Sequence, residues 1–174
     1  MKKFLVVPTV LVCFGFICTS AANAENPKNS PCYTLASLRG FYAVVGEYGS
    51  HIAISLGRRY FDGNGNLTQT FIVNEPTPGS TTGDRTIVNA TQEGTYTVNC
   101  DGTGVISRNL TTSNGITAHG EDDFVITAAV LRGDELIATT VVDAQKTPSA
   151  IVPGGIFLTR TYTRLPDRVV SPTP

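Results

Sequence analysis

The chain has 174 residues, of which 13 are Lys or Arg and 14 are Asp or Glu, so its net charge is −1. A near-neutral chain lacks the basic surface that nucleic-acid binding requires, and no nucleic-acid partner is expected. Charged residues make up only 16% of the chain and glycines number 17, which argues against a coiled coil and favours strands joined by turns.

The first segment has the three parts of a secretory signal peptide. Lys2 and Lys3 precede an apolar run at 4–18, and Ala22-Asn23-Ala24 supplies the small residues of a cleavage site. The apolar run is too short for a comfortable membrane span and no stop-transfer charges follow it. We therefore expect residues 1–24 to be removed and the protein to be periplasmic or extracellular. The mature chain should have no membrane span, and loss of the two lysines takes its net charge to −3.

Two of the four cysteines remain after export. Cys13 and Cys18 lie inside the signal peptide, whereas Cys32 and Cys100 belong to the mature chain. A cysteine pair in an oxidising compartment most often forms a disulfide, which for a loop of this length is worth roughly 4 kcal/mol in the chain-entropy model. Neither cysteine has a further Cys or His at ligand spacing, so neither a metal site nor another cofactor is expected.

The mature domain is expected to span 25–164, with a proline-rich tail at 165–174. Ser30-Pro31 has the pattern of a helix start, and Leu35 and Leu38 share one helical face, which predicts a short helix at 31–38.

From Gly40 onward, apolar and polar residues alternate with the period of two that is typical of strands. Asp62-Gly-Asn-Gly65 and Asp101-Gly-Thr-Gly104 have the composition of tight turns. Segments 74–85 and 144–155 are expected to be loops. Segments 116–119 and 124–131 form either a strand pair or one long bulged strand. The remaining predicted strands are 41–48, 52–57, 67–73, 86–90, 94–99, 105–111, 136–142 and 156–164.

Consecutive strands joined by tight turns predict an all-β domain with an antiparallel meander. Segments 124–131 and 136–142 are apolar on both faces, as in a sandwich or a covered barrel. Closing the meander removes exposed strand edges, so the favoured fold is a single up-and-down barrel of about eight strands with a short N-terminal helix. A two-sheet β-sandwich is the alternative.

Three segments carry a resemblance to known proteins. Cys32–Tyr42, Phe61–Leu67 and Gly94–Gly104 combine a Leu-x-Gly-x-Tyr strand with Asp-Gly-x-Gly turns. Together they resemble a family of exported bacterial proteins of unknown function. More distantly, the short helix before Gly40-Phe41-Tyr42 is similar to the start of lipocalin-like (calycin) barrels, although this chain has no tryptophan.

The lipocalin resemblance implies a small, largely apolar ligand in the barrel mouth, and a barrel of this size has room for one. Aromatic residues and one arginine on the predicted strands are the candidate ligand contacts: Tyr42, Phe71, Tyr96, Phe157 and Arg160. Two other functions remain open. The first is a cyclase or isomerase of the allene-oxide-cyclase type, and the second is a structural or surface-interaction protein whose loops contact a partner. The oligomeric state stays open.

An enzyme would need its acid and base in one cavity. Glu47 and His51 lie close together around the first turn, and His119 is the other histidine of the chain. A solvated turn explains the first pair equally well and is favoured. The acidic residues after His119, at 121–123, resemble a metal-ligand cluster, but an acidic loop in water is favoured over a metal site.

Overall fold

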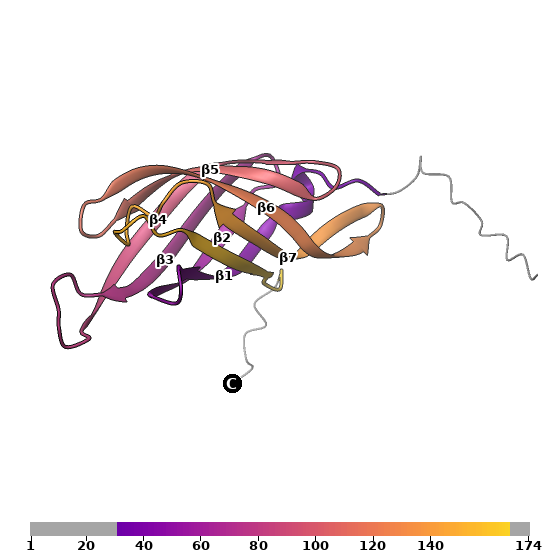
Figure 1. The fold of residues 1–174 in the computed structure, drawn as a ribbon. Coiled ribbons are helices and arrows are strands. Elements are labelled where there is room, and N and C mark those ends of the chain that lie inside the picture. The colour runs from indigo at the N-terminus through magenta and orange to yellow at the C-terminus, as the bar shows by residue number, and fades with distance from the viewer. Residues whose placement is uncertain (1–30, 168–174) are drawn as a thin grey trace, which may run out of the picture. The chain divides into compact units, whose positions relative to one another are not determined.

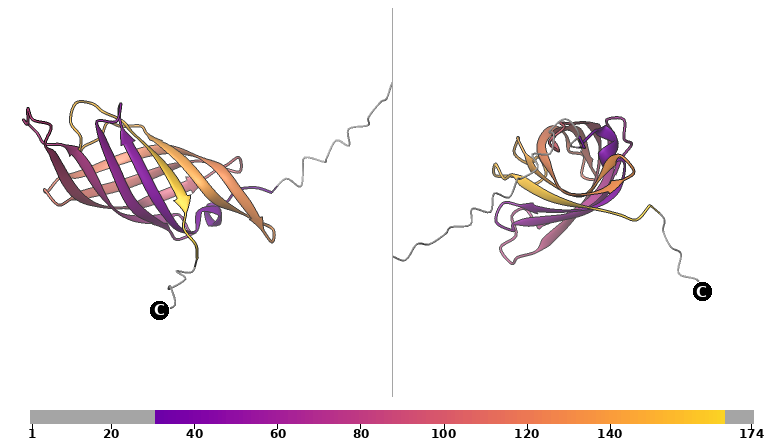
Figure 2. Two further views of the ribbon diagram at one scale, coloured as in Figure 1. Left: turned by 90° about the horizontal axis from the view of Figure 1, so that it is seen from below. Right: turned by 90° about the vertical axis from the view of Figure 1, so that its right-hand side faces the viewer.

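The computed structural model describes residues 31–167, which fold into a closed antiparallel β-barrel (Figure 1). The barrel is formed by eight strands, β1 (Gly40–Tyr48), β2 (Ala53–Phe61), β3 (Asn66–Pro76), β4 (Arg85–Val98), β5 (Thr103–Thr112), β6 (Thr117–Arg132), β7 (Glu135–Gln145) and β8 (Leu158–Arg164). Each strand pairs with the next along the chain, and β8 closes the barrel on β1. The predicted up-and-down barrel is therefore confirmed, and the sandwich alternative is excluded. Figure 2 shows the strongly tilted strands from the side and the closed ring from the end.

The predicted helix at 31–38 is shorter than expected. Only one 3-10 turn, η2 (Leu35–Leu38), forms there, and its N-cap is Thr34 rather than Ser30. The Ser37 side chain accepts a hydrogen bond from the Thr34 backbone N–H (3.0 Å) and stabilises the start of this turn. Leu38 is fully buried in the barrel end that η2 covers. The predicted signal peptide at 1–24 and residues 168–174 of the predicted tail lie outside the described residues.

Two pairs of predicted strands are each one continuous strand. The segments predicted at 86–90 and 94–99 are both parts of β4, which pairs with β3 without a break from Arg85 to Thr95. The segments at 116–119 and 124–131 form the single long strand β6, one of the two predicted alternatives. Its register against β7 shifts between Ile126 and Ala129 rather than at the acidic residues, which pair regularly with β5.

The β4–β5 turn is covalently tied to the segment before η2. Cys32 and Cys100 form the predicted disulfide, with 4.6 Å between their Cα atoms. Beside it, the Tyr33 backbone N–H donates a hydrogen bond to the Cys100 carbonyl oxygen (3.2 Å). The disulfide therefore holds the entry to the barrel against a turn that lies far away in the sequence.

Two glycines allow neighbouring strands to approach closely. A Cβ atom at Gly94 would overlap the Ser107 carbonyl oxygen of β5, and one at Gly104 would overlap the Phe124 ring of β6. Because a side chain at either position would push the strands apart, these glycines permit the tight curvature that closes an eight-stranded barrel.

The barrel interior is packed with two apolar clusters, one at each end. The cluster at the η2 end includes Leu38, Tyr42, Val44, Phe61, Leu67, Tyr96, Ile106, Phe124, Val141 and Tyr162. The cluster at the other end includes Tyr48, Phe71, Val73, Val88, Leu110 and Leu158, and the β7–β8 loop adds Ile151 and Val152. Both ends are therefore closed by apolar side chains, from η2 at one end and from a loop at the other.

Candidate functional site

A layer of polar side chains separates the two apolar clusters. Strands β2 to β8 each contribute a large inward-facing polar residue between the clusters: Arg59, Gln69, Gln92, Arg108, Asp122, Asp143 and Arg160. At the same level, β1 contributes Gly46, where a side chain would collide with Ser55, Leu158 and Arg160. The centre of the barrel therefore holds three guanidinium groups and two carboxylates, all of them buried.

Every charged group of this layer has a partner of opposite charge. Arg108 binds Asp122 with two hydrogen bonds (2.6 and 2.9 Å), and Arg160 bridges Asp122 (2.6 Å) and Asp143 (2.7 Å). Tyr162 donates a hydrogen bond to Asp143. Buried charges are tolerated when they are paired and hydrogen-bonded in this way.

Arg59 connects further residues of the polar layer through hydrogen bonds. Its guanidinium donates to the Gln69 side chain (2.7 Å), to the Gln92 side chain (3.0 Å) and to the Tyr162 hydroxyl (2.7 Å). Its Nη1 atom lies 3.9 Å from the Asp143 carboxylate. The network thus connects β2, β3, β4, β7 and β8 through one side chain.

Burial and charge act in opposite directions on these groups. Burial lowers the pKa of Arg59. Burial also disfavours the charged form of Arg160, but Asp143, Tyr162 and Asp122 outweigh it and raise the pKa of this arginine. Burial alone would raise the pKa of Asp122, yet Arg160 and Arg108 hold that pKa below its ordinary value. The electrostatic balance therefore keeps the Asp122 carboxylate ionised.

The polar layer leaves little room for a ligand in the barrel. The cavity beneath the β7–β8 loop, bounded by Tyr48, Gln92, Arg108 and Leu110 among others, has a volume of about 20 Å³. That is enough for about one water molecule. The lumen here is filled by its own side chains.

The predicted ligand contacts are not gathered in one place. Tyr42 and Tyr96 belong to the apolar cluster at the η2 end, Phe71 belongs to the cluster at the opposite end, and Arg160 lies in the polar layer between them. Phe157 precedes β8 and is 49% exposed. Three of the aromatic side chains therefore pack in the core, although Phe71 also lines a hollow of about 740 Å³ over β2 to β5. Arg160 serves as an ion-pair partner.

The predicted acid–base candidates lie at the surface. His51 and Glu47 are 3.4 Å apart with side chains 75% and 53% exposed, and His51 has the positive φ of 61° that suits a turn. His119 is on the outer face of β6, where it contacts Asn109 of β5 (3.2 Å). His119 and the buried Tyr48 both line the cavity of about 20 Å³ beneath the β7–β8 loop, but Glu47 and His51 do not line it.

The acidic residues after His119 divide between the two faces of β6. Asp122 points into the barrel, whereas Glu121 and Asp123 face outward, each 3.6 Å from the Lys146 ammonium group. Because successive residues of a strand face opposite sides, three adjacent carboxylates cannot converge on one ion. Within residues 31–167, no group of three or more His, Cys, Asp or Glu residues is placed to hold a metal.

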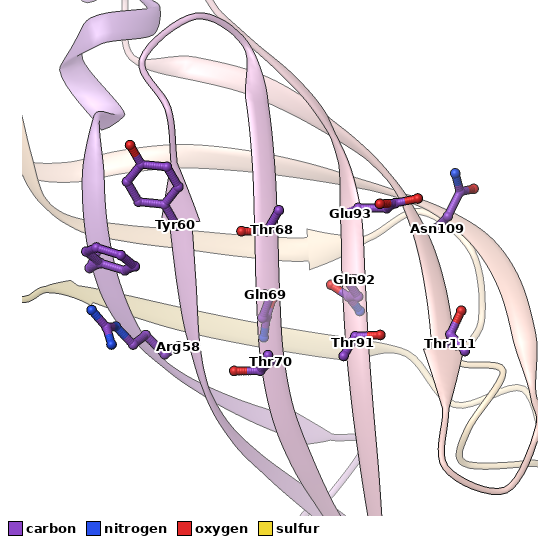
Figure 3. Close-up of a pocket in the computed structure, with 11 residues that line it drawn as sticks. Arg58, Tyr60, Thr68, Gln69, Thr70, Thr91, Gln92, Glu93, Asn109 and Thr111 are labelled. Atoms are coloured by element: carbon purple, nitrogen blue, oxygen red, sulfur yellow. The ribbon is translucent and has the colours of Figure 1, made fainter.

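The larger hollows of the molecule are on the outside of the barrel. Two adjoining hollows, of about 580 and 740 Å³, lie over β2 to β5 and share Arg58, Thr70, Thr91 and Thr111. Figure 3 shows the residues that line the hollow of about 580 Å³. We call these two together the outer hollow. The figure shows Arg58 and Tyr60 on β2 beside the polar side chains of β3, β4 and β5.

Aromatic and charged groups meet at one side of the outer hollow. The Arg58 guanidinium lies 3.7 Å from the centre of the Phe41 ring, a cation–π contact, and the ring centres of Phe41 and Tyr60 are 4.7 Å apart. At the other side, Leu56 and Ile72 are cross-strand partners and are 58% and 40% exposed. The hollow therefore combines an exposed apolar surface with hydroxyl, carboxylate and guanidinium groups.

The alternation of inward-facing and outward-facing residues along the strands could have located most of the buried charged groups of the polar layer. Asp122 has the same parity as the apolar Phe124 and Ile126, and Arg108 has the same parity as Ile106 and Leu110. Period-two counting therefore places both inside. The same rule places Arg58 and Arg59 on opposite faces, and in the structure Arg59 is buried whereas Arg58 is exposed.

No known protein-family model matches this chain, and comparison with curated proteins finds no relative. Comparison with solved structures finds a redesigned beta barrel, mFAP1, bound to DFHBI. The similarity has a TM-score of 0.40 and 20% sequence identity, and it covers 75% of this chain and 98% of that chain. Among residues 31–167 no helix has the length and apolar character that a membrane crossing needs.

Proposed function

We propose that this protein is exported and acts as a binding module for a small, partly apolar molecule, which it holds in the outer hollow rather than in the barrel lumen. One observation carries the proposal. The interior cavity measures about 20 Å³, whereas the hollows on the outer face measure about 580 and 740 Å³. Ligand sites of small molecules typically occupy about 300–1,000 Å³.

The lining of the outer hollow indicates the chemistry of this molecule. Leu56 and Ile72 offer an apolar surface, and the Phe41–Tyr60 pair offers aromatic edges and faces. Arg58 adds a positive charge that suits an anionic or electron-rich group. The ligand is therefore expected to have an apolar body and at least one anionic or hydrogen-bonding group.

Export is supported by the disulfide between Cys32 and Cys100, because such bonds persist in oxidising compartments. The test is the mass of the mature chain in fractionated host cells. We expect a chain that begins at Glu25 and carries one disulfide, recovered outside the cytoplasm. A full-length chain with reduced cysteines in the cytoplasm would contradict export.

Binding can be tested with anilinonaphthalene sulfonate, a fluorescent probe that has an aromatic body and one anionic group. We expect the folded protein to bind the probe, and the Leu56→Ser variant to bind it about tenfold more weakly, because about 1.4 kcal/mol of apolar contact is lost. Arg58→Gln should also weaken binding. Leu131→Ser is the matched control, since Leu131 is 60% exposed but lies outside the outer hollow.

The same experiment separates the outer hollow from the lumen. If Leu56→Ser binds the probe as tightly as the unchanged protein, the outer hollow is not the site. Loss of binding in Leu131→Ser to the same degree would indicate nonspecific adsorption and would equally overturn the proposal.

A further inference from the structure

A second pocket lies at the η2 end of the barrel, where three arginines converge. It has a volume of about 340 Å³ and is lined by Arg39, Arg132 and Arg164, with Glu135 and Asp167 as its acidic residues. Three positive and two negative side chains leave it with a net positive charge. We call it the arginine pocket. It shares only Tyr60 with the outer hollow.

Arg164 is held in a fixed position within this pocket. Its side chain is only 12% exposed, its Nη1 atom donates to the Tyr42 hydroxyl (3.2 Å), and its guanidinium lies 5.7 Å from the centre of the Tyr42 ring. Gly40 leaves the space that this guanidinium occupies, since a Cβ there would be 2.8 Å from Nη2. The buried Nε atom of Arg164 has no hydrogen-bond partner among residues 31–167.

The chain supplies a carboxylate to the arginine pocket. The two oxygens of Asp167 accept hydrogen bonds from different arginines, one from Arg132 (2.9 Å) and one from Arg164 (3.2 Å). Both contacts are charge-assisted hydrogen bonds from a guanidinium to a carboxylate, which are stronger than neutral hydrogen bonds. The preceding segment is fixed, because the Leu165 N–H donates to the Phe41 carbonyl oxygen (2.8 Å).

The Asp167 carboxylate is nevertheless easily displaced. It is 55% exposed, it follows the last strand, and its partner Arg132 is 59% exposed. Exposed ion pairs of this kind contribute little to stability. Without Asp167, the lining would carry three positive charges and one negative charge.

We propose that the arginine pocket is a binding site for a small-molecule carboxylate, and that Asp167 is its resident intramolecular competitor. An incoming carboxylate takes the Arg132 and Arg164 donors, and Asp167 moves into solvent. A tethered competitor acts at a high effective concentration, so its removal should strengthen binding of the free ligand.

The experiment measures the affinity for citrate by isothermal titration at constant ionic strength. We expect Asp167→Asn to bind citrate about tenfold more tightly than the unchanged protein. Asp123→Asn is the matched control, because it also removes an exposed aspartate from an ion pair. Its affinity for citrate should equal that of the unchanged protein.

Two double variants locate the site. Asp167→Asn with Arg132→Gln should lose the gain in affinity, whereas Asp167→Asn with Arg58→Gln should retain it, since Arg58 lies outside the arginine pocket. Thermal unfolding of each variant verifies that the barrel is intact.

The proposal is overturned if Asp167→Asn does not strengthen citrate binding, or if the gain survives Arg132→Gln. It is also overturned if Asp123→Asn strengthens binding equally, because the effect would then come from net charge. None of these outcomes bears on probe binding in the outer hollow, so the two proposals fail separately.

Discussion

Asp122 and Asp123 are neighbours in sequence and have the same side chain, yet they belong to different environments. Asp122 is fully buried, is bound by two hydrogen bonds from Arg108 and lies 2.6 Å from Arg160. Asp123 is 64% exposed and lies 3.6 Å from Lys146. The difference arises from one step along β6, since alternate residues of a strand face opposite sides of the barrel.

The same division holds on β2. Arg59 is buried and donates three hydrogen bonds within the lumen, whereas Arg58 lies on the outer face against Phe41. The inward-facing residues, Asp122 and Arg59, bind partners inside the barrel. The outward-facing residues, Asp123 and Arg58, remain accessible to solvent or to a ligand. Charge in the lumen is therefore structural, and charge on the outside is where we place binding.

The sharpest test of this comparison is the pair Asp122→Asn and Asp123→Asn, which removes one charge from each face without changing side-chain volume. We expect Asp122→Asn to lower the free energy of unfolding by about 3–5 kcal/mol, because two buried arginines lose a counter-charge. Asp123→Asn should cost less than about 1 kcal/mol. Urea unfolding monitored by circular dichroism measures both, and equal losses would refute the comparison.

The hydroxyls of Tyr162 and Tyr60 provide a second pair, with a smaller expected effect. The Tyr162 hydroxyl accepts a hydrogen bond from Arg59 (2.7 Å) and donates one to Asp143. Tyr162→Phe leaves both charged groups short of a partner and should cost about 1.5–3 kcal/mol. Tyr60→Phe, on the outer face, should change stability by no more than about 0.5 kcal/mol. Thermal or urea unfolding of the two variants makes the measurement.

Acid should remove the contribution of Asp122. Burial raises the pKa of this carboxyl, but Arg160 and Arg108 outweigh burial and hold its folded pKa below the ordinary value. A depressed folded pKa contributes stability above the unfolded pKa of about 3.9 and loses it as the pH falls through the folded pKa.

We therefore expect the stability difference between the unchanged protein and Asp122→Asn to be constant from about pH 5 to pH 7. It should shrink below about pH 4. Urea midpoints measured across this range give the result, and a difference that stays constant down to pH 2.5 would contradict the assigned pKa direction.

The smallest effect is expected for the outer ion pairs of Lys146. This ammonium group is 43% exposed and lies 3.6 Å from both Glu121 and Asp123. Lys146→Gln should cost less than about 1 kcal/mol in dilute buffer, and the loss should vanish at about 1 M sodium chloride because exposed pairs are screened. The loss caused by Asp122→Asn should persist in the same salt. Urea titrations with and without salt compare the two.

Local patterns in the sequence were sufficient to predict an antiparallel meander of strands. The alternation along β1 and β2 and the two Asp-Gly turns depend only on residues close in sequence. In the first turn, Asp62 accepts hydrogen bonds from the backbone N–H groups of Asn64 and Asn66 (2.7 and 2.9 Å), as its composition predicted. The disulfide followed from there being one cysteine pair in the mature chain. These features need no knowledge of distant contacts.

Local patterns failed at one run of polar residues within a strand. The run Thr91-Gln92-Glu93 looked like a break between two strands, because polar residues interrupt an apolar pattern. In the barrel, Gln92 faces inward and accepts a hydrogen bond from Arg59, while Thr91 and Glu93 line the outer hollow. One continuous strand β4 results.

The sequence by itself determined that this chain forms an antiparallel meander of strands, because strand period and turn chemistry are local properties. Closure of the meander into a barrel rather than a sandwich depends on the pairing of β8 with β1, which only the tertiary structure shows. Only the tertiary structure decided what fills the barrel and where a ligand fits. A buried arginine is stable only when carboxylates and amides from distant strands reach it, and Arg59, Asp122 and Asp143 are brought together by barrel closure alone. Barrel closure therefore fills the lumen with side chains, and the candidate site lies on the outer face of the barrel.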